Sequence, residues 1–286
     1  MREVDFDLIV SNIPGKVGDT AVAHFLTQSR HYLQPGGLVA IVVVNPLQAL
    51  VAATLQGMAD VTITLQKATR RYTVFHYRFE EERPSTPSHG LSDGIYHRDN
   101  ITVSVGKLSF PMQTARGLPE FDSLSHASVL LVKAIEKMKG TAVSRILIHN
   151  PGQGHIPAAV CKLLAPPEMV LVDRDLLALQ YSQLNLLAHH CPADRVALCH
   201  QVGMGEEDKV PELIICVLRD TEGVQGAKWV VQQAAELLVS GGMLLAAANS
   251  HLITQLTNYI KAEKSFQIQD RKKRKGYSSL VMQKNP

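Results

Sequence analysis

The chain has 286 residues, a formal net charge of +3 and 45% apolar residues, which is enough for one large domain or two small ones with ordinary buried cores. No apolar run reaches the roughly 20 residues of a membrane-spanning helix, and the charged N-terminus leads straight into a strand-like segment, so we expect neither a membrane protein nor a signal peptide. The four cysteines show no paired framework, which favours a reduced, cytoplasmic setting, and the mildly basic charge is compatible with an RNA partner without requiring one.

Hydrophobic periodicity predicts alternating strands and helices along the chain. We expect strands at 6–11, 37–45, 61–67 and 72–79 with helices at 19–33 and 46–58, then a strand at 101–105, helix 125–139, strand 145–149, helix 155–164, strand 169–173, helix 175–189, strands 195–199 and 212–217, helix 225–239, strand 242–248, helix 250–262 and strands 265–270 and 277–283. This alternation predicts an α/β fold with a doubly wound, mostly parallel sheet and a terminal antiparallel hairpin. The continuous apolar run from Leu38 to Val44 is typical of a parallel strand covered on both faces.

An internal repeat organises these elements. At an offset of 205 residues, residues 6–10 align with 211–215 and residues 33–38 align with 238–243, without gaps over about 75 positions. Tyr72 aligns with Tyr277, and a basic cluster precedes each tyrosine. Any two α/β segments share a strand–helix–strand rhythm, but a match that keeps its register through two turns and a helix favours a true repeat.

The two copies are unequal in length. About 110 residues precede the matching strand in the second copy, but only five or six precede it in the first. We therefore predict a truncated half-domain at 1–80, a linker at 81–100 that is rich in charge, proline, serine and glycine, and a complete domain at 101–286. We also expect the full gene product, or its ancestor, to begin about 100 residues before Met1.

A glycine loop in the second copy has the position of a cofactor site. Gly152 and Gly154 follow the predicted strand 145–149 and open a helix, where glycines let the backbone approach a ligand closely. Asp173 ends the next strand, about 20 residues on, where a carboxylate can accept hydrogen bonds from ribose hydroxyls. The alternative is a tight strand-to-helix turn, with Asp173 only capping the helix that starts near Asp175.

A second candidate site ends the first strand of the first copy. Asn12 and Pro14 lie at a strand end, where such sheets place ligands. An amide oxygen and a nearby carbonyl can accept hydrogen bonds from an exocyclic amine and hold its nitrogen for transfer of a methyl group, which needs chiefly positioning. The alternative is an ordinary turn. Because Val217 and Arg219 stand at the corresponding positions of the second copy, neither copy holds a full set of these residues.

Three other features carry less information. Metal-ligating residue types gather at 189–191 and 199–200, but without a Cys-x-x-Cys spacing, so no metal site is expected. The basic clusters at 67–71 and 271–275 each lie between the last two strands of their copy. Each is either a solvated hairpin or a contact for RNA phosphates. Neither a nucleophile elbow nor a phosphate-binding loop is present in the sequence.

The segment FDLIVSNIP at 6–14 resembles the strand-four motif of class I S-adenosylmethionine-dependent methyltransferases, usually Asn-Pro-Pro-Tyr/Phe. The tandem arrangement, and the lead-in at 113–128, resemble the ribosomal RNA guanine-N2 methyltransferases with a "methyltransferase small domain". By this resemblance Asn12 and Pro14 would hold the target amine, and Gly152, Gly154 and Asp173 would bind the cofactor, S-adenosylmethionine. In that family the C-terminal copy usually carries the Asn-Pro-Pro motif, which is absent from this second copy.

Three hypotheses follow. The first is an S-adenosylmethionine-dependent methyltransferase that acts on an exocyclic amine of an RNA base, by resemblance a ribosomal RNA. The second is a non-catalytic scaffold or RNA-binding module. In either case the first strand would be an unpaired edge, so we expect the half-domain to pack against the second copy, in a homo-oligomer, or against another partner that completes it. The third, a nicotinamide-dependent oxidoreductase, is equally consistent with the acidic residue at the strand end, but the terminal hairpin and the loop at 11–14 favour the first.

Overall fold

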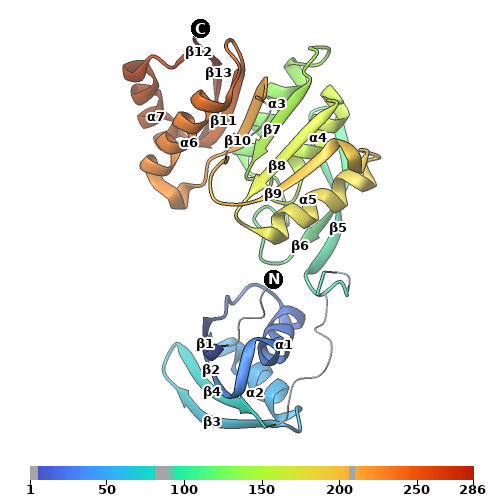
Figure 1. Cartoon of the computed structure of the whole chain (residues 1–286), viewed down its shortest axis with the longest axis vertical. Coiled ribbons are helices and arrows are strands. Elements are labelled where there is room, and N and C mark those ends of the chain that lie inside the picture. Colours follow the sequence, from blue (N-terminus) through green and yellow to red (C-terminus); the bar gives the residue numbers. More distant parts are fainter. Residues whose placement is uncertain (1–5, 81–89, 92, 206–209) are drawn as a thin grey trace. The chain divides into compact units, whose positions relative to one another are not determined.

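A computed structural model describes residues 6–80, 90–91, 93–205 and 210–286. The chain divides into two compact units, an N-terminal unit over Met1–Arg98 and a C-terminal unit over Asp99–Pro286 (Figure 1). Most of the predicted linker, residues 81–89 and 92, lies outside the described residues. None of the helices in the described ranges is long and apolar enough to cross a membrane.

The N-terminal unit is a four-stranded sheet with two α-helices. Its elements are β1 (Phe6–Asn12), α1 (Asp19–Gln28), β2 (Leu33–Val44), α2 (Gln48–Gln56), β3 (Val61–Ala68) and β4 (Tyr72–Phe79). The strand order is β1-β2-β4-β3, in which β1 and β2 are parallel and the other two neighbouring pairs are antiparallel. Strand β1 therefore forms one edge of this sheet.

Both α-helices of this unit pack on the same face of the sheet. Val39, Ile41 and Val43 of β2 belong to the core that includes Leu26 of α1 and Leu55 of α2. The alternate residues of β2 are only half-buried, and Val44 is 44% exposed. The prediction that this apolar run is covered on both faces is therefore wrong for the unit by itself: the strand is buried on one face only.

The C-terminal unit contains the larger sheet. Its elements are β5 (His97–Val105), β6 (Leu108–Ala115), α3 (His126–Lys137), β7 (Arg145–His149), α4 (His155–Leu164), β8 (Glu168–Asp173), α5 (Leu176–Ala188), β9 (Val196–His200), β10 (Leu213–Val217), α6 (Gly223–Leu237), β11 (Met243–Asn249), α7 (Ser250–Glu263), β12 (Phe266–Arg274) and β13 (Tyr277–Lys284). The strand order is β12-β13-β11-β10-β7-β8-β9, and only β13 runs antiparallel to its neighbours. The predicted mostly parallel, doubly wound sheet is confirmed, although the antiparallel strand is inserted next to the edge strand β12 rather than forming the edge.

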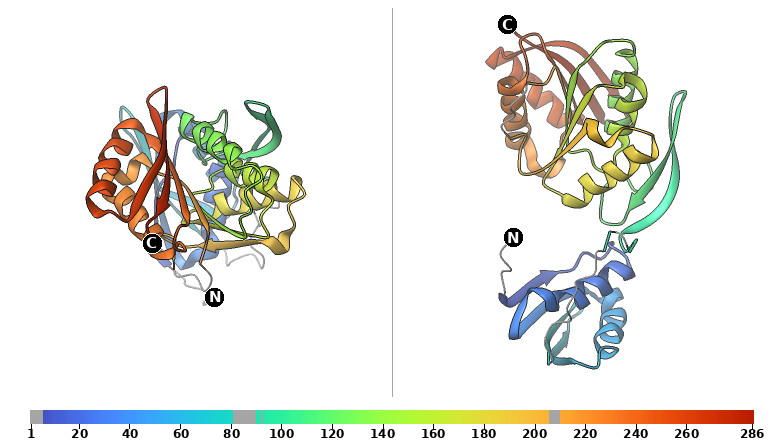
Figure 2. Two further views of the ribbon diagram at one scale, coloured as in Figure 1. Left: turned by 90° about the horizontal axis from the view of Figure 1, so that it is seen from above. Right: turned by 45° about the vertical axis from the view of Figure 1, so that its right-hand side comes forward.

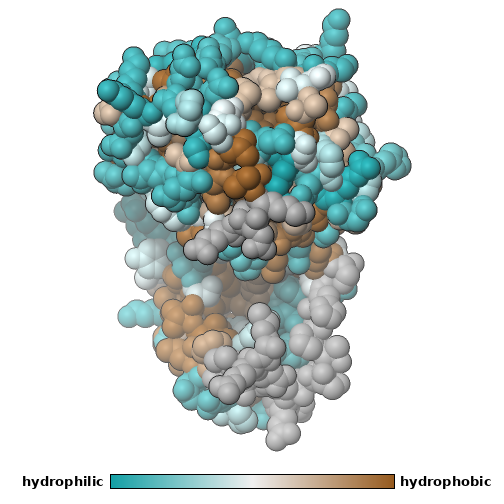
Figure 3. Space-filling view, turned by 45° about the horizontal axis from the view of Figure 1, so that its top comes forward, coloured by the Kyte–Doolittle hydropathy of each residue, from teal (hydrophilic) through white to brown (hydrophobic). Residues whose placement is uncertain are grey.

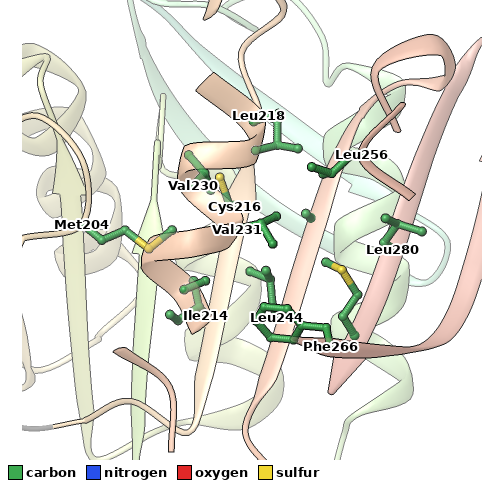
Figure 4. Packing of buried hydrophobic residues seen from close by; sticks show 14 of the residues in the cluster. Met204, Ile214, Cys216, Leu218, Val230, Val231, Leu244, Leu256, Phe266 and Leu280 are labelled. Carbon is green, nitrogen blue, oxygen red and sulfur yellow. The ribbon is translucent and has the colours of Figure 1, made fainter. Parts of the chain in front are cut away.

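Helices cover both faces of this sheet (Figure 2). Helices α6 and α7 contribute Val230, Val231 and Leu256 to a core with β10, β11 and β13, and Met204, from the segment before β10, is buried with them (Figure 4). Helices α3, α4 and α5 cover the other face, where side chains of α3 pack on β7, β10 and β11. The strands β7, β8 and β10 are therefore buried on both sides, as continuous apolar runs predict.

A hairpin precedes this sheet and was only partly predicted. From the sequence we expect one strand at 101–105, but β5 and β6 pair as a separate two-stranded sheet that begins inside the predicted linker. Gly106, at φ +61°, opens the short turn between them, where glycine adopts a left-handed conformation without strain. The hairpin brings Ala115 to the helix that begins after β7.

The sheet of the N-terminal unit has the same pairing as the last four strands of the larger sheet. In both, two parallel strands are followed by an antiparallel hairpin whose second strand is inserted next to them. The registers also agree at the offset of 205 residues. The equivalent positions are the pairs Leu8–Leu38 and Leu213–Met243, the pairs Val44–Tyr72 and Asn249–Tyr277, and the register shifts after Ile63 and Ile268.

Candidate functional site

The loop after β7 lies where the strand order of the large sheet reverses, because β10 pairs with one side of β7 and β8 with the other. Doubly wound sheets bind ligands at this point. The loop begins at Asn150, which has a φ of +59° and donates its backbone N–H to the carbonyl of Val172 over 3.0 Å. It continues through Pro151 to Gly154, and α4 follows at once, so the N-terminus of α4 points into the loop.

The two predicted glycines have different surroundings. Gly152 has a φ of +59°, and a Cβ atom added there would meet nothing within 4 Å. At Gly154, with a φ of +93°, an added Cβ would lie 2.9 Å from the Cα atom of Ser182 in α5. Gly152 therefore leaves open space for a ligand, whereas Gly154 allows α4 and α5 to pack closely.

Two buried side-chain amides hold the preceding hairpin against this loop, and neither was predicted from the sequence. Gln153 is fully buried, and its side chain makes hydrogen bonds with both backbone groups of Ala115, at 2.9 and 3.1 Å. The Asn185 side chain bonds both backbone groups of Gln113 and donates to the Gln153 carbonyl. A buried amide in helix α5 is a weak signal of such a role in the sequence, because its partners are set only by the fold.

Asp173 lies at the end of β8, as predicted, and is completely buried. Its two carboxylate oxygens accept hydrogen bonds from Nη2 of Arg219, at 2.7 and 2.9 Å, and one of them also accepts the backbone N–H of Asp175. The alternative, in which Asp173 caps the next helix, is not what is seen: the side chain of Asp175 caps α5 by accepting the N–H of Leu177. Asp173 is therefore a buried acceptor whose partner is an arginine from the end of β10.

Asn150 bonds a second acceptor at the carboxyl ends of these strands, the backbone carbonyl of Val217. Its side-chain amide donates to the backbone carbonyl of Val217 over 3.0 Å. Val217 is the residue that stands 205 positions after Asn12, and the following residues form the same backbone bond in both units. Leu218 donates to the Ala247 carbonyl, and Ile13 donates to the Val42 carbonyl.

Two pockets open beside Asn150, which lines both. The larger has a volume of about 230 Å³ and extends over Gly152, Arg219 and Tyr277 towards the start of α3. The smaller has about 180 Å³ and lies among the ends of β7 and β9 and the exposed ring of Trp229 on α6. Arg219 lies just after β10 and Asp173 ends β8, with β7 between these two strands. Their ion pair therefore lies where the carboxyl ends of the three strands meet.

Electrostatics differ between the two pockets. In the smaller one, burial and the positive charges of Arg219 and Arg174 lower the pKa of His149 to about 4, so its ring is neutral at pH 7. In the larger one, burial would raise the pKa of Glu120, but the nearby His155 and hydrogen bonds from Ser125 and Ser128 outweigh it, and the pKa is lowered. Within the described residues His155 Nε2 is buried without a hydrogen-bond partner, and Nδ1 lies 3.5 Å from Oε2 of Glu120.

The second predicted set, Asn12 and Pro14, lies in the N-terminal unit. Asn12 is the last residue of β1, and its side chain is exposed, as is that of Pro14. Ile13 between them is 2% exposed and fixes the turn through its backbone bond to Val42. The structure thus places the glycine loop with Asp173 in one unit and the Asn-x-Pro turn in the other, so neither unit contains both sets.

The remaining sequence features have structural partners. Among the described residues no group of three or more His, Cys, Asp or Glu side chains is placed to hold a metal ion. His189 and His200 instead contact the backbone carbonyls of Pro111 and Arg174. The basic cluster at 271–275 lies at the exposed end of the β12–β13 hairpin, where Arg271 donates to Thr254 and Lys272 pairs with Asp270.

No protein-family model matches the chain, and no curated protein matches it in sequence. Solved structures match its fold. The 16S rRNA N2 G1207 methyltransferase of T. thermophilus, in complex with AdoMet and guanosine, has a TM-score of 0.68 and 18% identity over 99% of this chain and 74% of that one. The ribosomal protein L11 methylase of Lactobacillus delbrueckii subsp. bulgaricus has a TM-score of 0.53 and 13% identity over 65% of this chain and 99% of that one. The chain therefore has the Rossmann-like fold of these methyltransferases.

Proposed function

We propose that this protein is an S-adenosylmethionine-dependent methyltransferase that acts on an exocyclic amine of an RNA base, with ribosomal RNA as the first substrate class to test. The observation that carries the proposal is the glycine loop and buried Asp173 at the reversal point of the sheet, with a pocket on either side of Asn150. A ligand with two dissimilar ends joined by a sugar would suit two pockets that meet at Asn150. The name of the T. thermophilus neighbour, a 16S rRNA methyltransferase, suggests the substrate class.

The residues present suit such a cofactor if Arg219 turns away from Asp173. Gly152 leaves the backbone open to a ligand, and the freed carboxylate of Asp173 would accept hydrogen bonds from the ribose hydroxyls. Arg219 is 24% exposed at its side chain, so it lies at the rim and can move towards solvent. S-adenosylmethionine supplies an electrophilic methyl group, and the protein's task is to hold the acceptor nitrogen in line.

Asn12 and Pro14 are the proposed holders of that amine. The Asn12 side chain is exposed at the end of β1, where its amide oxygen can accept a hydrogen bond from an amino group. Pro14 fixes the φ angle of the turn that follows. In this proposal the chain is a tandem protein, in which residues 1–80 are the back half of one methyltransferase domain and residues 101–286 are a complete one, as their equal strand registers suggest.

A non-catalytic scaffold is the second candidate function, and the hydrogen bonds within the site favour it. In the C-terminal unit both acceptors of the site are already engaged, Asp173 by Arg219 and the Val217 carbonyl by Asn150. A unit in this state would be a non-catalytic scaffold. The exposed basic hairpin at 271–275 would then be the part that contacts RNA, through phosphates rather than bases.

Calorimetry on the full chain separates the two. S-adenosylmethionine and its demethylated product are titrated separately, and the proposal expects micromolar binding that Asp173→Ala abolishes, with the exposed Asp99→Ala as a matched control. Absence of binding at millimolar ligand would exclude the cofactor site and leave the scaffold function. Where binding is found, turnover on RNA is compared between the wild type and Asn12→Ala, and equal turnover would refute the role of Asn12.

A further inference from the structure

The sheet of the N-terminal unit has an uncovered face. Leu8 and Val10 of the edge strand β1 are 50% and 73% exposed, and they lie on the face opposite to the two helices of the unit. The pairing places Val10 beside Ala40 of β2 and His76 of β4 in one row across the sheet. In the space-filling view, apolar patches interrupt the hydrophilic surface (Figure 3). A face of this kind on a sheet normally packs against another element.

The C-terminal unit shows what covers the equivalent face. The residues 205 positions later, Leu213, Ile215 and Leu245, are all completely buried. They belong to one core with Leu131 and Ile135 of helix α3. This helix lies across the strands of the back half of the sheet. An amphipathic helix with apolar residues about four apart therefore fits the face.

The strand equivalent to β1 in the C-terminal unit, β10, has a neighbouring strand on each side. In the C-terminal unit β10 pairs in parallel with β7, over Leu213–Ile146 to Cys216–His149. Strand β1 has the same parallel neighbour on one side, β2, and its other side is a sheet edge in the described part of the unit. An open edge of apolar residues is a template for a further strand.

A third feature lies on the helix-covered face. A pocket of about 340 Å³ lies between β1 and α1, lined by Ile13, Gln28, Tyr77 and other residues of the unit. In the C-terminal unit the residue equivalent to Gln28 is Gln233, whose side chain accepts the backbone N–H of Met204. Met204 itself is completely buried in the core (Figure 4). By this equivalence, the pocket of the N-terminal unit corresponds to the position of Met204 in the C-terminal unit.

We propose that the N-terminal unit is a docking surface for a polypeptide segment with the architecture of residues 126–205 of this chain. Such a segment offers an amphipathic helix for the open face, an apolar strand parallel to β1, and an apolar loop residue for the pocket. The three features are filled in the C-terminal unit by one continuous stretch of chain, so one occupant accounts for all of them. This inference does not depend on cofactor binding by the C-terminal unit.

The first test is hydrogen–deuterium exchange on the 286-residue chain. The backbone amides of Phe6–Asn12 should exchange at least about a hundredfold faster than those of Leu213–Val217, because paired core strands open only rarely. Equal protection of the two strands in the free chain would overturn the proposal, since the edge would already be covered. Protection that rises with protein concentration, together with dimer formation in sedimentation, would also overturn it by identifying a second copy as the occupant.

The second test supplies the occupant. Residues 99–210 are placed directly before Phe6 of the full chain, a junction that keeps the offset of 205 residues. The proposal expects protection of Phe6–Asn12 to rise to the level of Leu213–Val217. Val10→Lys in the extended chain should remove the gain, whereas Val210→Lys in the C-terminal unit, which is also exposed, should leave it. Unchanged exchange of β1 beside a protected added strand would refute the docking surface.

Discussion

Arg219 and Asp173 form an ion pair in which one guanidinium nitrogen donates to both carboxylate oxygens, at 2.7 and 2.9 Å. Asp173 ends β8 and Arg219 lies just after β10, and these strands lie on opposite sides of β7, so the pair spans the strand end that carries the glycine loop. Arg219 stands 205 positions after Pro14. The position of Pro14 in the N-terminal unit is thus occupied in the C-terminal unit by the arginine that bonds to the buried Asp173.

Arg219→Ala therefore tests whether this ion pair closes the site. A hydrogen bond to a charged group contributes about 1.5–3 kcal/mol, so removal of the competitor should tighten S-adenosylmethionine binding by roughly tenfold or more in calorimetry. The variant should also unfold more easily, because Asp173 is left buried and without its partner. Arg271→Ala, in the exposed hairpin, is the control. Unaltered affinity would show that Arg219 does not compete with the ligand.

The protonation of His149 predicts a loss of stability in mild acid. Its pKa is about 4 in the folded protein, against 6.5 for an ordinary histidine. The unfolded chain therefore binds a proton between pH 6.5 and 4 that the folded chain does not, so stability is full above pH 6.5 and declines as the pH falls towards 4, by about 3 kcal/mol.

Urea unfolding at pH 7 and 4.5, followed by the fluorescence of Trp229, measures this decline in the C-terminal unit, because Trp229 is the single tryptophan of the chain. His149→Gln removes the titrating ring, so the decline should be clearly smaller in that variant. Equal declines in the variant and the wild type would assign the acid sensitivity to groups other than His149.

The elements that the sequence predicts well are those with a local signal. The strands around Ile146, Leu171 and Ile214 are short apolar runs, and their alternation with helices fixes a doubly wound sheet. The hairpin β5–β6 was half missed because its second strand contains Pro111 and polar residues, and its bonds run to Gln153 and not to the main sheet.

The site was predicted by position but not by contact. Gly152, Gly154 and Asp173 follow from a glycine loop and an acidic strand end. The pairing of Asp173 with Arg219 spans 46 residues of sequence, and no local pattern indicates it. The coverage of Val42 was misjudged for a similar reason: an apolar run shows that a strand can be buried on both faces, not that a helix is present to bury it.

The buried amide of Gln153 predicts a strong effect on stability. Gln153→Leu leaves both backbone groups of Ala115 without partners in a completely buried position, and each unsatisfied group costs about 1–3 kcal/mol. We expect the free energy of unfolding to fall by at least about 2 kcal/mol in urea titrations. Gln267→Leu, on the exposed side of β12, should change it by less than about 0.5 kcal/mol. A small effect of Gln153→Leu would mean that the hairpin is held by other contacts.

The two glycines of the loop should respond differently to the same substitution. Gly154→Ala places a methyl group 2.9 Å from the Cα atom of Ser182, so α4 and α5 must separate and the melting temperature should fall markedly. Gly152→Ala meets no atom, and its cost is the left-handed backbone at φ +59°, about 1 kcal/mol. The added methyl group instead occupies space beside the larger pocket, which Gly152 lines. Calorimetry should therefore show the greater loss of S-adenosylmethionine binding for Gly152→Ala, and thermal unfolding the greater loss of stability for Gly154→Ala. The reverse order would show that the ligand approaches the loop at Gly154 and that Gly152 is only a turn.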